Sequence, residues 1–157
     1  MSEALAPPFL VASLLLCVAG ALKLRSSRGA MGALGAGEIV LGAACAAHPT
    51  PALAVALAVV YASFAAVAVI LMRRRVACGC FGENDDFPVS LAHVIASVFL
   101  GSLALAAAVA GPRGLGWVLG QQAPIAAALT IGIAGAVYAV VLVYTAVPRT
   151  WAAWSVE

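Results

Sequence analysis

Five long apolar runs, almost free of charged residues, constrain the fold of this chain more than any other feature of its sequence. They cover residues 4–22, 29–48, 52–72, 89–110 and 125–147. A helix needs about 20 mainly apolar residues to cross the roughly 30 Å hydrocarbon core of a bilayer. Hydrophobic residues make up 65% of the chain and charged residues 9%, so little remains for a separate soluble domain. We therefore predict an all-α integral membrane protein, a single domain over residues 1–157.

The helices are expected to form a four-helix transmembrane bundle plus a fifth, C-terminal transmembrane helix. The second run is the weakest because it is rich in glycine and carries Glu38 in its interior. Small residues let helices approach closely inside lipid. We therefore expect the glycines of the second and fifth runs to face other helices, namely Gly32, Gly35, Gly37, Gly42, Gly132 and Gly135.

The basic residues predict the orientation of the chain. With five spans, seven of the eight Lys and Arg residues fall on one side, and only Arg113 falls on the other. Cytoplasmic loops carry an excess of these residues. This bias predicts a multi-pass plasma membrane protein with the N-terminus outside, and with the C-terminus and the loop between the third and fourth spans in the cytoplasm. A net charge of +2 gives no reason to expect a nucleic-acid partner.

Glu38 is the one acidic residue that the membrane makes costly. It lies roughly 13 Å into the second span, where a bare carboxylate is expensive. Lys23 closes the first span just across a short connection, and its long side chain can reach Glu38 in an antiparallel hairpin or extend to the cytoplasmic surface. We predict Lys23 and Glu38 as an intramembrane polar pair, with a functional role for Glu38 as the sharper hypothesis.

Reactive chemistry is concentrated in the loop Cys78-Gly79-Cys80-Phe81-Gly82. A Cys-Gly-Cys disulfide closes a small strained ring, which favours exchange over permanent crosslinking. We therefore predict Cys78 and Cys80 as the catalytic residues of a thiol–disulfide exchange. Two alternatives stay open: a reduced pair without a role, or half of a metal site completed by His93 or Asp85. No usual four-ligand zinc spacing is present, so no metal is assigned.

The other polar and aromatic residues outside this loop have structural interpretations. Cys17 and Cys45 lie within spans, where single cysteines are most often packing residues. His48 is expected in a turn and His93 at a packed helix end. Three tryptophans fall just beyond span ends and are expected to anchor at the membrane interface, namely Trp117, Trp151 and Trp154. We expect residues 111–122 to form an ordinary exposed connection, although they could re-enter the interface.

Three motifs together resemble a known family. They are Gly20-Ala21-Leu22-Lys23-Leu24-Arg25, Glu38-Ile39-Val40-Leu41-Gly42 and the Cys-Gly-Cys-Phe-Gly loop. Over roughly residues 9–110 the chain resembles the MauE family of methylamine-utilisation membrane proteins, which is related to DoxX. The resemblance implies a helical bundle that acts beside thioredoxin-like partners in the maturation of disulfide-containing proteins. It points to Cys78 and Cys80 as the redox pair.

The expected bundle also looks broadly similar to the quinone-linked thiol oxidoreductases of the DsbB and vitamin K epoxide reductase type. Those enzymes use two cysteine pairs, whereas this chain has one vicinal pair and two scattered cysteines. No cofactor is assigned, and a quinone is left open. The expected partners are membrane lipid and a thioredoxin-like or other membrane protein. The alternative function is a non-enzymatic accessory subunit of a membrane complex; transport is disfavoured.

Overall fold

Six helices make up the part of the chain that the computed structural model describes, residues 2–26, 29–74 and 91–145. They are α1 (Ser2–Ser26), α2 (Ala30–Ala47), α3 (Pro51–Arg74), α4 (Leu91–Ala110), α5 (Leu115–Leu119) and α6 (Ala123–Thr145). All but α5 are long and apolar enough to cross a membrane. The prediction of an all-α membrane protein with five spans is confirmed.

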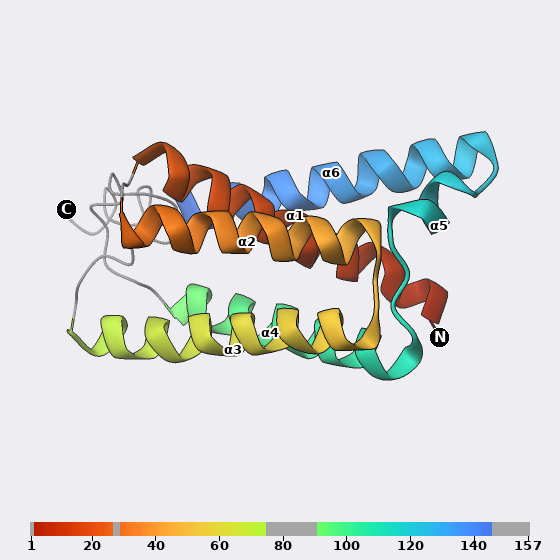
Figure 1. The fold of residues 1–157 in the computed structure, drawn as a ribbon. Coiled ribbons are helices and arrows are strands. Elements are labelled where there is room, and N and C mark those ends of the chain that lie inside the picture. The colour runs from red at the N-terminus through yellow and green to blue at the C-terminus, as the bar shows by residue number, and fades with distance from the viewer. Residues whose placement is uncertain (1, 27–28, 75–90, 146–157) are drawn as a thin grey trace, which may run out of the picture.

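The helices pack as two antiparallel hairpins with one helix alongside (Figure 1). The helices α1 and α2 form one hairpin, and α3 and α4 form the other. The helix α1 is central because it also contacts α4 and α6. The main core lies between the hairpins and is built from α1, α2, α3 and α4, with Phe9, Leu16, Leu57 and Leu100 among its buried side chains. The expected four-helix bundle with a fifth helix beside it is what the structure shows.

The ends of α1 extend beyond the predicted span. The apolar run predicts residues 4–22, whereas the helix runs from Ser2 to Ser26. A hydropathy pattern marks only the part of a helix that lies in hydrocarbon, and the helix continues through polar residues at both ends. Pro7 and Pro8 therefore lie inside the helix, past its first turn. Each removes one intrahelical N–H donor, which a helix tolerates best near its N-terminus.

The glycine prediction is correct for one helix face and wrong for another. Gly32, Gly35 and Gly42 are buried in α2, as expected. A β-carbon added at Gly37, Gly132 or Gly135 would meet nothing within 4 Å. These three glycines therefore make no close contact with another helix in the part of the chain that the structure describes. Composition alone cannot separate the two sets, because a glycine favours close packing only when its helix turns it toward a neighbour.

The connection between α4 and α6 is more ordered than predicted. Gly111 takes a φ of 87°, a conformation that favours glycine, and the short helix α5 follows. Val118 of α5 is 1% exposed and packs with Leu10, Ala46 and Ile133. A β-carbon at Gly114 would lie 2.7 Å from Cδ of Pro49. The expectation of an ordinary exposed loop is thus wrong, because Val118 gives this segment an apolar anchor on the end of the bundle.

Candidate functional site

The candidate site is built on the very close approach of α1 and α2. A β-carbon at Gly35 would lie 2.7 Å from the carbonyl oxygen of Gly20. One at Gly42 would lie 2.6 Å from Sγ of Cys17, closer than real β-carbons approach such atoms. Only glycine fits at these positions without a shift of the backbone. The two helices therefore meet with their backbones nearly in contact, as small residues allow in membranes.

This close approach brings Lys23 and Glu38 together as a buried ion pair. Nζ of Lys23 donates a hydrogen bond to Oε1 of Glu38. Lys23 is 3% exposed and Glu38 is 4% exposed. Glu38 lies eight residues after the start of α2, about 12 Å along its axis at a rise of 1.5 Å per residue. The structure therefore brings together the two residues that the sequence predicted as a polar pair, and the lysine does not extend to the surface.

Two aromatic residues of α3, Phe64 and Tyr61, lie beside the ion pair. Nζ of Lys23 lies 4.9 Å from the centre of the Phe64 ring, within the range of a cation–π interaction. The Tyr61 ring meets the Phe64 ring edge to face, with 5.9 Å between centroids. The Tyr61 hydroxyl donates a 2.7 Å hydrogen bond to the carbonyl oxygen of Ala12 in α1. The charged pair thus links three helices.

One atom of the site has no partner in the part of the chain that the structure describes. Oε2 of Glu38 is buried and accepts no hydrogen bond there. A buried ion pair stabilises a protein only when its geometry offsets the loss of solvation. Here Oε1 is paired with Lys23 and the ammonium also faces an aromatic ring. Oε2 of Glu38 can therefore still accept a hydrogen bond, in a region where water is scarce.

Two further polar side chains are buried on α4. His93 is 9% exposed and Ser97 is 7% exposed, and a spacing of four residues places them on one face of the helix. His93 is packed, as the sequence predicted. The sequence analysis missed Ser97, Tyr61 and Phe64. The two aromatic residues interrupt a run of mostly aliphatic residues in α3 at a spacing of three, and that interruption is the signal that could have identified them.

The single cysteines of the spans have packing roles. Sγ of Cys17 lies 3.7 Å from the carbonyl oxygen of Ile39, and Sγ of Cys45 lies 3.5 Å from that of Leu53. Cys45 is fully buried. Both are free thiols. Weak contacts from a thiol to a helix carbonyl are typical of cysteine in an apolar core.

The predicted catalytic residues, Cys78 and Cys80, lie outside the described residues, as does the metal-ligand candidate Asp85. The helices on either side of this segment are described. Arg74 ends α3 and Leu91 begins α4, at the same end of the bundle as the connection between α1 and α2 (Figure 1). Within the described ranges, no group of three or more His, Cys, Asp and Glu side chains could hold a metal ion.

The fold and the ion pair define a polytopic helical membrane protein with a glycine-packed hairpin and a charged pair inside its bundle. The model of the family described as methylamine utilisation protein MauE matches residues 22–111. This match covers more than half of the 157 residues, so the chain belongs to the MauE family. The matched segment contains Lys23, Glu38, Cys78 and Cys80. No curated protein and no solved structure gave a match.

Proposed function

We propose that this protein is a membrane component of thiol–disulfide exchange, with Cys78 and Cys80 as its redox pair and a thioredoxin-like protein as its partner. The observation that carries the proposal is the family match, because the segment it covers includes both cysteines and the polar pair. Membership associates the chain with methylamine utilisation. The chemistry proposed for the cysteines comes from their spacing.

The exchange proceeds in two balanced steps. The thiolate of one loop cysteine attacks a partner disulfide, forming a mixed disulfide and releasing one partner thiolate. The second loop thiol loses its proton and attacks the mixed disulfide. This step releases the partner as a dithiol and leaves a Cys78–Cys80 disulfide. The reverse sequence passes the disulfide to a reduced partner, so a second dithiol protein resets the pair in each cycle.

The bundle holds the helices on either side of the cysteine segment in place. The ion pair holds α1 and α2 together, and Phe64 ties α3 to the same site. The helices that lead into and out of the cysteine segment are thereby attached to a rigid hairpin. In this proposal Lys23 and Glu38 act as positioning residues that maintain the bundle. We place the cysteine segment and the C-terminus in the cytoplasm, and the N-terminus outside, on the distribution of Lys and Arg.

The experiment replaces each loop cysteine by serine in a Cys17→Ala/Cys45→Ala background. Thiols are then counted by alkylation with a maleimide that adds mass. The Cys17→Ala/Cys45→Ala protein, which keeps both loop cysteines, should show two modified thiols in reducing buffer and none in oxidising buffer. Either serine variant should show one modified thiol in every buffer. A membrane-impermeant maleimide, applied to intact cells and then to inverted vesicles, assigns the exposed side. Two modified thiols at every redox poise would contradict the proposal.

A second candidate is a non-enzymatic accessory subunit of a membrane complex. The observation that favours it is the weak packing of α6. Only 6% of the residues in its most apolar 18-residue stretch are buried. Such a helix offers a long face to another membrane protein. The same cysteine variants separate the two functions. An accessory subunit retains its effect on the complex when both loop cysteines are serine, whereas an exchange component loses it.

A further inference from the structure

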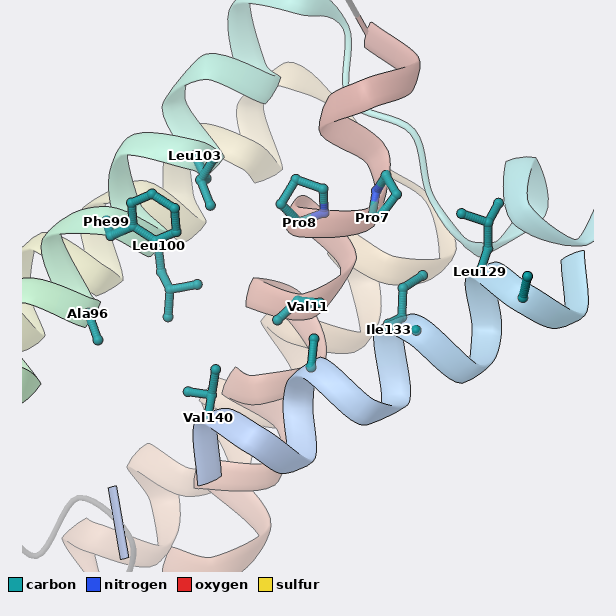
Figure 2. Close-up of a pocket in the computed structure, with 13 residues that line it drawn as sticks. Pro7, Pro8, Val11, Ala96, Phe99, Leu100, Leu103, Leu129, Ile133 and Val140 are labelled. Carbon is teal, nitrogen blue, oxygen red and sulfur yellow. The ribbon is translucent and has the colours of Figure 1, made fainter. Parts of the chain in front are cut away.

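A narrow apolar slot lies between α4 and α6 and has α1 as its floor (Figure 2). Both helices contact α1, and few contacts join one to the other. The cavity between them measures about 460 Å³. Every residue that lines the cavity is apolar: aliphatic, aromatic, glycine or proline. The labelled Pro7, Pro8 and Val11 of α1 form its floor (Figure 2). The slot therefore offers no side-chain hydrogen bond to a ligand.

The dimensions of the slot select the kind of occupant. Along α6 the lining extends from Ala128 to Val140, about 18 Å at a rise of 1.5 Å per residue. A helix about 10–12 Å wide occupies about 1,400–2,000 Å³ over the same length, several times the 460 Å³ of the cavity. The cavity therefore has room for one extended hydrocarbon chain rather than for a helix of a partner.

One end of the slot lies close to a charged group. Pro7 is one helical turn from Glu3, whose Oε1 lies 3.8 Å from a guanidinium nitrogen of Arg113. The Arg113 guanidinium also lies 5.8 Å from the centre of the Trp117 ring. The Arg113 side chain is 38% exposed, and Arg113 is the single Lys or Arg that the sequence places on this side. A partly exposed arginine at the end of an apolar slot suits a phosphate group, because its several donors match phosphate oxygens.

We propose that the slot binds one acyl chain of a membrane phospholipid, with the phosphate of the headgroup at Arg113. The α1 floor residues and the whole α6 wall lie outside residues 22–111, the part that matches the family. The lipid site therefore combines the α4 wall, which lies within the matched part, with α1 and α6 residues outside it. It is independent of the cysteine chemistry. A bound chain fills the space between α4 and α6 that the protein leaves open.

The test uses phosphatidylethanolamine with a diazirine in the middle of one acyl chain, incorporated into phosphatidylcholine vesicles that contain the full protein. After illumination, peptide mass spectrometry locates the crosslinks. The expected products lie on slot residues of α4 and α6, such as Phe99 and Val140. The variant Gly132→Leu fills the slot from α6 and lowers this crosslinking about tenfold, equivalent to about 1.4 kcal/mol of binding free energy. Ala96→Leu fills it from α4 with the same effect.

Each filling variant has a matched control. Gly135→Leu changes a glycine of the same helix that does not line the slot, and a β-carbon there meets nothing within 4 Å. Ala92→Leu changes an exposed alanine one turn from Ala96. Both controls should retain the crosslinks. Equal labelling on every face of α6, unchanged in Gly132→Leu, would overturn the proposal. Specific displacement of the crosslink by a quinone with an isoprenoid tail, but not by unlabelled phospholipid, would also overturn it.

Discussion

The helices α1 and α6 are about equally apolar but are packed in opposite ways. In the most apolar 18-residue stretch of each helix, 50% of the residues of α1 are buried, against 6% of those of α6. Both α2 and α6 carry paired glycines. A β-carbon at Gly35 or Gly42 of α2 would meet backbone and side-chain atoms of α1 at short range, whereas one at Gly132 or Gly135 of α6 would meet nothing within 4 Å. Apolar character therefore places a helix in the membrane, and small residues and polar partners at the correct register fix its position in the bundle.

The largest expected effect tests the ion pair that fixes the hairpin. Lys23→Met or Glu38→Leu leaves one buried charge without its partner, and the loss is expected at about 3–5 kcal/mol in the free energy of unfolding. Unfolding in mixed detergent micelles, followed by circular dichroism, measures this loss. The double variant removes both charges and should recover most of the stability. Additive losses in the double variant would show that the two residues do not act as a pair.

The second comparison separates glycines that pack from glycines that do not. Gly42→Leu inserts a side chain where a β-carbon already lies 2.6 Å from Sγ of Cys17. Overpacking of this kind costs about 1–3 kcal/mol. Gly135→Leu makes the same change in α6 and should alter the free energy of unfolding by less than about 0.5 kcal/mol. Equal losses in the two variants would remove the distinction between the hairpin and α6.

Tyrosine hydroxyls offer a smaller contrast of the same kind. Tyr61→Phe removes the hydrogen bond to the carbonyl oxygen of Ala12, which is expected to cost about 1 kcal/mol. Tyr138 in α6 is 65% exposed, and Tyr138→Phe should leave stability unchanged. The unfolding midpoints of the two variants, measured in one detergent mixture, give the comparison. A greater loss for Tyr138→Phe would contradict the assignment of the buried hydroxyl.

The smallest effect is expected on the outer face of α6. Ile131 is 73% exposed, so Ile131→Ala removes methyl groups that contact lipid and leaves no cavity in the protein. The free energy of unfolding should change by less than about 0.5 kcal/mol. The measurement is the same detergent titration, with Leu16→Ala in the buried core as the reference for a true packing loss. A loss equal to that reference would show that this face of α6 is covered by protein.

Much of the fold could be predicted from the sequence, because a helix needs about 20 mainly apolar residues to cross the hydrocarbon core. The five spans, their hairpin order and the pairing of Lys23 with Glu38 all derive from apolar runs, short connections and the cost of a bare charge in lipid. Helix ends differ by a few residues, since helices continue past the apolar region. The α5 helix was missed because five residues carry too little periodicity to distinguish a helix from a loop.

The site was predicted less completely than the fold. Lys23 and Glu38 stand out because charge is rare in a span, whereas the aromatic interruption of α3 at Tyr61 and Phe64 does not indicate which residue they contact. Their role depends on which face of α3 meets Lys23, and this is decided by packing. The same reason explains the error at Gly132 and Gly135, where composition indicates a capacity for close packing but not a neighbour. The slot between α4 and α6 likewise depends on packing, and no motif marks it.

A redox titration of Cys78 and Cys80 tests the proposed thiol–disulfide exchange most directly. Purified protein in vesicles, with Cys17 and Cys45 replaced by alanine, is equilibrated with glutathione buffers of increasing oxidation, and peptide mass is measured after rapid alkylation. For a redox pair we expect a reversible two-electron transition in which the loop peptide loses two hydrogens and both alkyl groups together. Two alkylated thiols at every ratio, or oxidation that no thiol buffer reverses, would contradict it.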